Sequence, residues 1–502
     1  MKRVISLLAT LLLFTGCSAA QETTTFEHLS DLSGHKIGGL IGSIFYEPLK
    51  ENIENCEVEL LSSLSEQVMA LKTHKIDAFI TDDMVVYTLV NDDPSLAYID
   101  EPVVKYDVGF IFSDEKEELR KQFNEFLDKC WKSGYMDELD KKWNPTNGTG
   151  REQKKEKYNL TGENGSIKVI SSLESQPFSF LSNNEPQGYE TELLERFAYE
   201  YGYSIELTQG NFDTIIPSIV SGRYDVAYSV ITVSEERKKQ VNFSDPIYKA
   251  SGLLIIRNPE VETSDDFIDV ITNKFYATFI EEDRWKIILD GTLTTLLITA
   301  ISAIMGTIAG FILYLIYRKA YTFIKKFLDF NEYIVNGLPI VVLLMILFYV
   351  VFAKSKTSGI IISIIGFSIV MCSSVFGLLK SGVDAIDKGQ MEGALALGYS
   401  ENEALYKFVL PQALKIVMSS YQGEIVSLVK STSVVGYVTV QDLTRATDII
   451  RSRTYDAFFP LIVTATIYFF LARILIRYIS RIQNRHFAFE KTKEEILKRV
   501  KD

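Results

Sequence analysis

The pattern of hydrophobic and polar residues changes near the middle of this 502-residue chain. Up to about position 257, apolar residues fall in short runs, separated by polar or amphipathic segments with helical spacing. This alternation of strands and helices predicts an α/β architecture. Beyond position 283 the apolar runs are long, the clearest being 297–317. Because a helix needs about 20 apolar residues to cross a bilayer, the second half predicts an all-α transmembrane domain.

Five spans are predicted in that domain. The fourth contains Glu424 and Lys430, and charged side chains within a span usually face a bundle interior or a pathway. The segments after the first and last spans, RKAYTFIKKF and RYISRIQNRHF, are basic and should be cytoplasmic. Five spans then place everything before the first one on the opposite, extracytoplasmic side. The predicted spans lie near 287–317, 332–353, 358–380, 412–440 and 457–480.

The N-terminal half divides into two structured segments. Residues 26–145 contain a buried strand, IDAFI, that ends beside Asp82, and they close with amphipathic helices. Residues 166–257 repeat the α/β pattern. The polar, Asn- and Gly-rich stretch 146–165 between them has no apolar period and reads as a linker. The rest of the chain is predicted to form a tether at 258–282, the membrane domain at 283–487 and a cytoplasmic tail at 488–502.

The first 20 residues predict an export signal, because a basic start precedes an apolar run too short to span a bilayer. Thr15-Gly16-Cys17 resembles a bacterial lipobox, which would make Cys17 a lipidated residue, although Phe14 occupies the usual Leu position. Plain secretion and an uncleaved anchor are the alternatives.

Composition and charge exclude several classes of function. The formal net charge of −13 argues against nucleic acid as a partner. The four cysteines have no paired metal-ligand spacing, so no metal site is expected. The chain also lacks a G-x-x-x-x-G-K-[ST] phosphate loop. We therefore expect no catalytic residues and no cofactor in this chain.

The polar segment 392–411, EGALALGYSENEALYKFVLP, lies between long apolar runs and should sit in water beside the bilayer. Its Glu, Ala, Gly and Leu-Pro resemble the E-A-A…G…I-x-L-P motif of permease subunits of bacterial ABC importers, although Gly393 and Phe408 replace the usual Ala and Ile. In that family the segment is the coupling helix that docks onto the ATP-binding subunit. The matching residues are Glu392, Ala394, Gly398, Leu410 and Pro411.

The residues that follow extend this resemblance. Residues 411–443 resemble the P-Q-A…L-x-K-x-T-S segment of polar amino-acid permeases. Asn336-Gly337-Leu338-Pro339 stands where that family has R-G-T-P, so roles of the family's Arg and Thr do not carry over.

The two N-terminal segments resemble the two halves of a polar amino-acid substrate-binding protein in reversed order. Residues 166–257, with T-x-x-x-x-R…F-S-D-P-x-Y, are similar to the first half, which builds most of lobe 1. Residues 26–145, ending in G-Y-x-x-x-L-x-K-K-W, are similar to lobe 2 and the helices that return to lobe 1. We expect a circularly permuted, two-lobed periplasmic-binding-protein-like domain, since permutation is tolerated where termini lie close together. Two decayed tandem domains are the alternative.

The resemblance also implies a binding site. A free amino acid needs a cation for its carboxylate and an anion for its ammonium group. Arg237 would grip the carboxylate as a bidentate fork, with Thr232 beside it. Ser43, expected to begin a helix, would add free N–H groups. Asp82, at the carboxyl end of a strand, would bind the ammonium group.

Alternatives exist for three of these positions. An Arg in a run such as SEERKKQ is usually a solvated helix residue. Asp83 is adjacent to Asp82 and could serve instead. Phe212 would form an apolar wall of the site, but it is about equally a candidate for the core.

The combined prediction is an amino-acid ABC transporter permease, located in the bacterial cytoplasmic membrane, with a fused extracytoplasmic binding domain. It would import a polar amino acid, pair with a second permease copy, and rely on ATP and Mg²⁺ bound by a separate ATP-binding subunit. An amino-acid-gated channel is one alternative, for which VVGYV at 434–438 resembles a pore loop. A transport-inactive amino-acid sensor is another.

Overall fold

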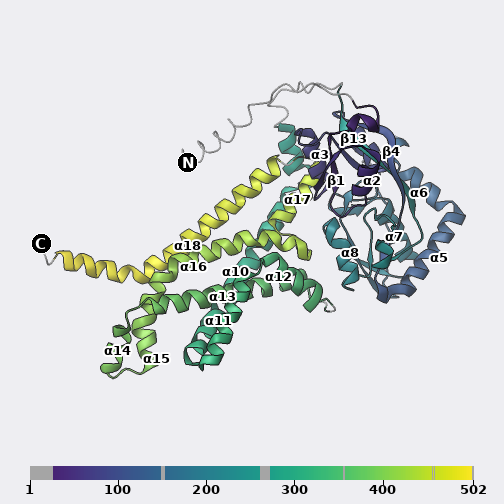
Figure 1. Ribbon diagram of the computed structural model, residues 1–502. Coiled ribbons are helices and arrows are strands. Elements are labelled where there is room, and N and C mark those ends of the chain that lie inside the picture. Colours follow the sequence, from purple (N-terminus) through teal and green to yellow (C-terminus); the bar gives the residue numbers. More distant parts are fainter. Residues whose placement is uncertain are drawn as a thin grey trace.

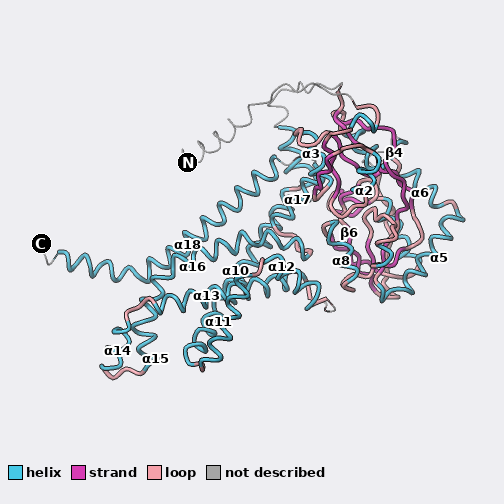
Figure 2. Tube along the Cα trace, in the orientation of Figure 1, coloured by secondary structure: helices cyan, strands magenta, loops and turns pink. Residues whose placement is uncertain are grey.

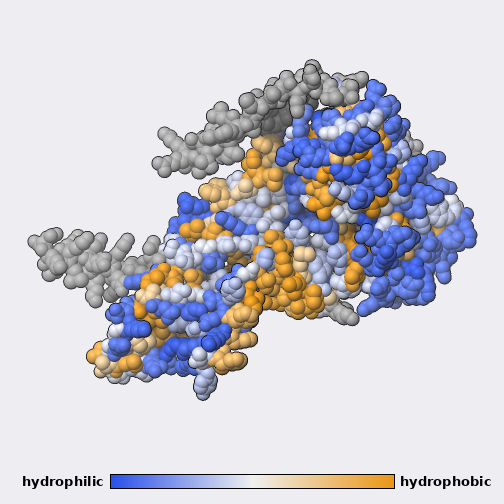
Figure 3. Space-filling view, in the orientation of Figure 1, coloured by the Kyte–Doolittle hydropathy of each residue, from blue (hydrophilic) through white to orange (hydrophobic). Residues whose placement is uncertain are grey.

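The computed structural model describes residues 26–147, 153–259 and 272–499, apart from positions 354, 356, 455 and 457, with side chains up to position 481. The export signal and Cys17 lie outside the described residues. Among the described residues, strands occur only in the N-terminal domain, and the part from 272 onward is mainly helical (Figure 2). The surface of the N-terminal domain is mainly hydrophilic, whereas apolar residues gather over the helices (Figure 3). The chain is therefore an α/β domain followed by a helical membrane domain.

The first sheet of the N-terminal domain forms what we call lobe 2. Its strand order is β2-β1-β3-β13-β4. β1 pairs in parallel with β2 and β3, and β13 pairs antiparallel with β3 and β4. The strands are β1 (Lys36–Leu40), β2 (Glu57–Leu61), β3 (Ala78–Asp82), β4 (Leu96–Val108) and β13 (Tyr248–Arg257), and the helices are α2 (Tyr46–Asn52), α3 (Leu64–Lys72) and α4 (Asp83–Asp92).

The second sheet forms lobe 1, with the order β10-β6-β11-β5-β12. Its strands are β5 (Ile111–Phe112), β6 (Ser166–Ser171), β10 (Ser204–Gln209), β11 (Val226–Ala227) and β12 (Asn242–Phe243). Its helices are α5 (Glu117–Ser133), α6 (Tyr135–Trp143), α7 (Tyr189–Glu200) and α8 (Phe212–Val220). A small antiparallel sheet, β7 (Glu174–Ser175), β8 (Ser179–Ser182) and β9 (Glu185–Gln187), adjoins them.

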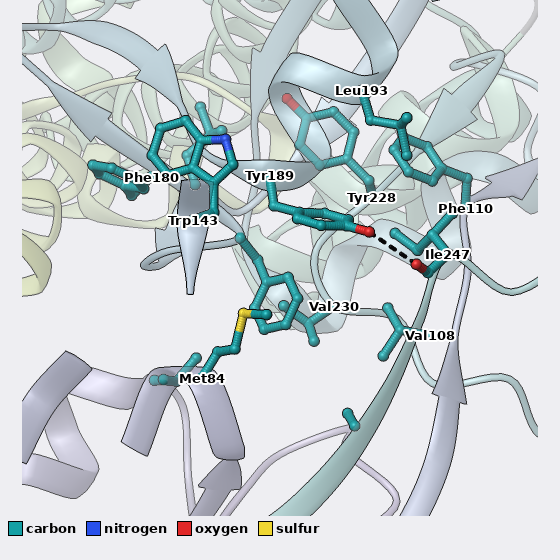
Figure 4. Packing of buried hydrophobic residues seen from close by; sticks show 14 of the residues in the cluster. Met84, Val108, Phe110, Trp143, Phe180, Tyr189, Leu193, Tyr228, Val230 and Ile247 are labelled. Atoms are coloured by element: carbon teal, nitrogen blue, oxygen red, sulfur yellow. Dashed lines mark hydrogen bonds between the residues drawn. The ribbon is translucent and has the colours of Figure 1, made fainter. Parts of the chain in front are cut away.

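The two N-terminal segments interleave. β13, from the later segment, lies inside the sheet of lobe 2, and β5, from the earlier segment, lies inside the sheet of lobe 1. In both sheets, the fourth strand in the spatial order is the one that comes from the other segment. Residues of both segments also share one hydrophobic core, where Phe110 packs against Tyr228 and the Tyr189 hydroxyl donates to the Ile247 carbonyl oxygen at 3.0 Å (Figure 4).

The end of the earlier segment and the start of the later one meet on lobe 1. At the end of α6, the Trp143 Nε1 donates to Glu192 of α7 at 2.8 Å. The described part of the connecting stretch then follows lobe 1, where the Lys155 N–H donates to the Gln187 side chain at 2.9 Å. The described residues on either side of positions 148–152 therefore contact the same lobe.

The membrane domain is built from long helices. α10 packs along α13 through Gly306 and Gly310, four residues apart. A Cβ at Gly306 would lie 2.5 Å from the Met371 Cβ, and one at Gly310 would lie 2.7 Å from the Cys372 carbonyl oxygen. Small residues at this spacing let membrane helices approach closely. The elements are α10 (Trp285–Lys319), α11 (Thr322–Gly337), α12 (Ile340–Ile346), η7 (Leu347–Val351), α13 (Gly359–Asp384), α14 (Lys388–Ala396), α15 (Glu401–Ala404), η8 (Leu405–Val409), α16 (Leu410–Ser431), η9 (Thr432–Val438), α17 (Leu443–Thr454) and α18 (Phe458–Arg499).

The number of candidate spans differs from the predicted five. In the described residues, three helices are long and apolar enough to cross a membrane: α10, α13 and the part of α18 up to Arg481. A fourth is obtained if α11 and the α12–η7 segment count as one span, but these are bent by 104°. The bend falls at Leu338-Pro339, because proline cannot donate within a helix and it forces the preceding residue into an extended conformation. The span predicted near 332–353 is therefore interrupted at Pro339, and the predicted count of five spans is not confirmed.

The binding domain and the predicted coupling segment lie at opposite ends of the membrane helices (Figure 1). Lobe 1 contacts residues near η7 and η9: the Arg223 guanidinium donates to the carbonyl oxygens of Phe352 (3.2 Å) and Thr357 (2.5 Å). α14 and α15 project from the far end of α13 and α16. The membrane helices therefore connect the two regions that carry the candidate functional residues.

Candidate substrate-binding cleft

A pocket of about 40 Å³ lies between the two lobes. This volume has room for only a few water molecules, so the cleft is closed around it. Four of the residues predicted to bind substrate line it, two from each lobe. They are Ser43 and Asp82 of lobe 2, and Phe212 and Thr232 of lobe 1.

Arg237 lies at the junction of the lobes. Its side chain is buried, which excludes the alternative of a solvated helix residue. It donates to the Thr232 carbonyl oxygen at 3.0 Å and, across the cleft, to the Gly42 carbonyl oxygen at 2.5 Å. Burial lowers the pKa of Arg237 from its usual value. The guanidinium is therefore a buried cation whose two partners here are neutral carbonyl groups.

Asp82 ends β3, as the sequence predicted, and its carboxylate accepts a hydrogen bond from the Tyr106 hydroxyl. Burial raises the pKa of Asp82 to about 7; the Tyr106 hydrogen bond opposes this shift and the neighbouring Asp83 charge adds to it. Asp83 instead accepts from the backbone N–H groups of Met84 and Ser251, at 2.8 and 3.0 Å. Asp82 lines the pocket, whereas Asp83 secures the junction of α4 with β13.

Ser43 and Phe212 reach the pocket by different routes. The helix expected to begin at Ser43 begins at Tyr46 instead, because the Ser43 hydroxyl closes a turn by donating to the Leu40 carbonyl oxygen at 2.7 Å. The free N–H groups expected there are therefore displaced by three residues. Phe212 is the first residue of α8, and its ring faces Gly42 of lobe 2. It is half-buried at the pocket wall.

Several pocket residues were not predicted from the sequence. Gln67 of α3 is buried, and its side-chain Nε2 has no hydrogen-bond partner among the described residues. Glu174 lines the pocket and pairs with Arg445 of the membrane domain at 3.5 Å. No local sequence pattern identifies either residue as part of a site. Gln67 occupies an ordinary position within the helix α3, and the ionic partner of Glu174 is distant in the chain.

Glu190 supports the pocket from behind. Its two carboxyl oxygens accept from the Val230 N–H at 3.0 and 3.2 Å. Val230 lines the pocket with φ of +53°, a conformation that is costly for a β-branched residue. Burial raises the pKa of Glu190 to about 8. Glu190 thus holds a strained backbone position at the site.

The predicted coupling residues form a helical hairpin. α14 carries Glu392, which is exposed, and Ala394, which is buried. Gly398 has φ of +89° and ends α14: its N–H donates to the Leu395 carbonyl oxygen, and the Tyr399 N–H donates to that of Ala394. This is a Schellman motif, which favours glycine because of its positive φ.

α15 and α16 follow this turn. The Ser400 hydroxyl accepts from the Glu403 N–H and the Glu403 carboxylate accepts from the Ser400 N–H, a capping box that begins α15. Leu410 and Pro411 occupy the first turn of α16. At the tip of the hairpin the Leu397 side chain is 78% exposed, so an apolar contact surface faces outward.

Comparisons with known proteins agree with this arrangement. Residues 167–294 match the family of bacterial extracellular solute-binding proteins, family 3, and residues 302–488 match the binding-protein-dependent transport system inner membrane component. A putative glutamine transport system permease protein of Rickettsia bellii is 32% identical over 39% of this chain and 90% of its own length. The arginine transport system permease protein of Bacillus subtilis is 31% identical over 38% and 87%, respectively.

A solved amino acid ABC transporter with histidines also resembles the chain. It is 24% identical with a TM-score of 0.39, covering 44% of this chain and 100% of its own. The family assignment rests on the two permease relatives and the two domain matches. The chain belongs to the inner membrane permeases of amino-acid ABC transporters and carries a solute-binding domain in the same polypeptide.

Proposed function

We propose that this protein imports a polar amino acid, which its own binding domain captures and its membrane helices translocate. The observation that carries the proposal is the position of two opposite charges beside the cleft. Asp82 of lobe 2 lines the pocket, and Arg237 of lobe 1 donates to the carbonyl oxygen of Thr232, which lines the pocket too. The substrate carboxylate would replace the Gly42 carbonyl as a partner of Arg237, forming charge-assisted hydrogen bonds. Its ammonium group would pair with Asp82, with Thr232 and Ser43 as further polar contacts.

The charges around the pocket favour a substrate with an uncharged polar side chain. Beyond the groups that bind the α-carboxylate and α-ammonium, the charge of Glu174 is countered by Arg445. Gln67 brings an unpaired amide N–H, and Ser62 and Ser229 bring hydroxyl groups. A buried polar group without a partner is costly, so a substrate amide or hydroxyl that pairs with Gln67 would be favoured over an apolar side chain. Phe212 would cover the substrate stem.

The binding domain is proposed to be circularly permuted, with segments 26–145 and 166–257 forming one unit joined by the linker 146–165. The sheet of each lobe contains one strand from the other segment, β13 in lobe 2 and β5 in lobe 1, which supports this proposal. Two independent half-domains would each lack that strand and would leave unpaired strand edges. The described part of the linker contacts lobe 1, which also supports it, because permutation requires neighbouring termini.

The remaining parts of the transporter follow from the family. The hairpin of α14 and α15 is proposed to dock onto a separate ATP-binding subunit, which would hold ATP and Mg²⁺, and its exposed Leu397 suits such a contact. The hairpin would be cytoplasmic and the binding domain extracytoplasmic, at opposite ends of helices embedded in the bacterial inner membrane. A permease homodimer and lipidation of Cys17 complete the proposal.

The test is substrate binding by the full chain in lipid nanodiscs. We expect calorimetry to detect one or more of glutamine, asparagine, serine and threonine, and no binding of arginine or glutamate. Arg237→Ala should weaken binding about 100-fold, since hydrogen bonds to charged groups contribute roughly 1.5–3 kcal/mol. Lys239→Ala is the matched control, because Lys239 lies two residues away and is exposed. Equal substrate affinity of Arg237→Ala and wild type would contradict the assignment of Arg237 as the partner of the substrate carboxylate.

Uptake distinguishes the alternative functions. Binding without uptake in proteoliposomes supplied with the ATP-binding subunit would favour a sensor, and substrate-dependent ion conductance without ATP would favour a channel.

A further inference from the structure

α17 lies between the membrane helices and both lobes of the binding domain. On one side it packs tightly against α10: a Cβ at Gly291 would lie 2.6 Å from the Asp442 carbonyl oxygen and 2.8 Å from the Ala446 Cβ. On the other side it presents Arg445 and Arg451, both largely buried, to the binding domain. A shift of α17 would therefore be transmitted directly to α10.

Arg445 reaches lobe 1 at the wall of the substrate pocket. Its guanidinium donates to the Gly210 carbonyl oxygen at 3.0 Å and pairs with Glu174 at 3.5 Å. Glu174 is itself a pocket residue. Burial raises the pKa of Glu174, and the Arg445 charge opposes this shift. The membrane domain thus contributes a charge next to the pocket.

Arg451, two turns further along α17, reaches lobe 2. Its guanidinium lies 3.6 Å from the Glu66 carboxylate. Glu66 is in the first turn of α3, where it accepts from the Ser62 N–H at 2.9 Å and the Ser62 hydroxyl at 2.6 Å. Burial opposes ionisation of Glu66, but the Ser62 hydrogen bonds and the Arg451 charge lower its pKa overall. Ser62 lines the pocket, so Arg451 is linked to the opposite wall of the same cleft.

Lobe 1 has additional anchors that do not depend on cleft closure. The Arg223 guanidinium lies 3.7 Å from the centre of the Phe348 ring and donates to two membrane-domain carbonyl groups. The Tyr224 hydroxyl contacts the Thr439 hydroxyl at 3.3 Å. These contacts come from the far end of lobe 1 and hold it on the membrane domain whatever the position of lobe 2.

From this geometry we infer that α17 senses cleft closure, with Arg451–Glu66 as the closure-dependent contact. The inference rests on the proposed function. The chain crosses between the lobes twice, from β4 to β5 and from β12 to β13. When the cleft opens by rotation about these crossings, Glu66 moves with lobe 2 while lobe 1 stays anchored. Arg451 then loses its partner across the interface. Substrate that closes the cleft restores the pair and favours the α17 position that packs against α10, which links substrate occupancy to the transport helices.

The first test is cross-linking of the full chain with Glu66→Cys and Arg451→Cys, in nanodiscs, by a short thiol-reactive bifunctional reagent, because the charged ends that meet at 3.6 Å belong to long side chains. Saturating substrate should raise the cross-linking rate about threefold or more, because it shifts the population toward the closed cleft. A pair on the anchored interface, Tyr224→Cys and Thr439→Cys, should cross-link at a rate that substrate does not change. If substrate changes the cross-linking rate of neither pair, although calorimetry shows that substrate binds, the inference is overturned and the proposed function stays intact.

The second test separates coupling from folding. Glu66→Gln keeps an oxygen acceptor for the Ser62 N–H and hydroxyl and removes only the charge, so the substrate Kd should stay within about threefold of wild type. It should nevertheless reduce substrate stimulation of ATP hydrolysis by the complete transporter. Exchanging the charges, with Glu66→Arg and Arg451→Glu together, should restore stimulation that each single variant lacks. Lys72→Gln, on the same helix but paired with Asp93, is the matched control. Full stimulation in Glu66→Gln would contradict the inference, and loss of binding in the wild type would instead refute the proposed function.

Discussion

The two lobes of the binding domain share one sheet arrangement, yet they contact the membrane domain in different ways. Lobe 1 is attached through Arg223, Tyr224 and the Glu174–Arg445 pair. Lobe 2 meets α17 through Glu66, whose partner Arg451 reaches it at the edge of the cleft. Each lobe also supplies an acidic residue to the pocket, Glu174 from lobe 1 and Asp82 from lobe 2. The difference fits the inference that side-chain contacts hold lobe 1 on the membrane domain, while lobe 2, whose β13 precedes α10 in the chain, reports substrate through one ion pair.

The largest expected effect comes from releasing the anchored lobe. Arg223→Ala removes two hydrogen bonds and a cation–π contact from the lobe 1 interface. Uptake in proteoliposomes should fall about 100-fold, since such contacts together contribute roughly 3 kcal/mol. Substrate affinity should be unchanged, because Arg223 is not a pocket residue. Lys121→Ala, an exposed lysine on α5 of lobe 1, is the control. Normal uptake by Arg223→Ala would contradict the claim that transport requires lobe 1 to be held on the membrane domain.

Loss of the lobe 2 charge should have a somewhat smaller effect. Asp82→Asn keeps the shape of the side chain but removes the anion that the substrate ammonium group requires. We expect calorimetry to give a Kd about 30-fold higher than wild type, consistent with roughly 2 kcal/mol for a charged hydrogen bond. Asp83→Asn should instead lower thermal stability with a smaller change in Kd, because Asp83 binds backbone groups. The reverse pattern would assign the ammonium group to Asp83.

The same carboxylate predicts a pH dependence of binding. Burial raises the pKa of Asp82 to about 7, and the ammonium group of the substrate binds the ionised form. A proton must therefore be released on binding below this pKa, and affinity should fall about tenfold for each pH unit below 7 and level off above it. Asp82→Asn should abolish this dependence. A wild-type affinity that is constant between pH 5 and 8 would contradict the assignment.

The smallest effect is expected behind the pocket in lobe 1. Burial raises the pKa of Glu190 to about 8, above its unfolded value, so its contribution to stability is complete below about pH 4.5 and is lost as pH rises through 8. Glu190→Gln keeps an acceptor for the Val230 N–H and cannot ionise. We expect it to lower the Tm by only a few degrees at pH 6, in keeping with about 1 kcal/mol. It should also reduce the loss of Tm between pH 6 and 9.

Features set by local sequence were predicted well. The strand that ends at Asp82 follows from a short buried run. Gly398 was identified from the sequence only through a family motif, although its positive φ at a helix end is one that glycine adopts readily. The pocket position of Thr232 follows from a family motif and not from any local rule. Pro339 could have indicated the break in the second predicted span, but the apolar residues on both sides dominated the prediction.

Features set by distant contacts could not be predicted. Arg445 and Arg451 lie on α17, a helix between the fourth and fifth predicted spans that was not predicted from the sequence. Their partners Glu174 and Glu66 are hundreds of residues away, and their pairing depends on how the lobes sit on the membrane domain. The burial of Gln67 without a partner likewise becomes visible only once both lobes enclose it.

The most direct test of the difference between the lobes is a pair of distance measurements by electron spin resonance on the full chain in nanodiscs. One label pair would join Lys75 of lobe 2 to Lys286 of α10, and the other would join Lys121 of lobe 1 to Lys286, all three being exposed. Saturating substrate should shift and narrow the distance distribution of the lobe 2 pair and leave that of the lobe 1 pair unchanged. Movement of both pairs together, or of the lobe 1 pair alone, would contradict an anchored lobe 1 and a substrate-reporting lobe 2.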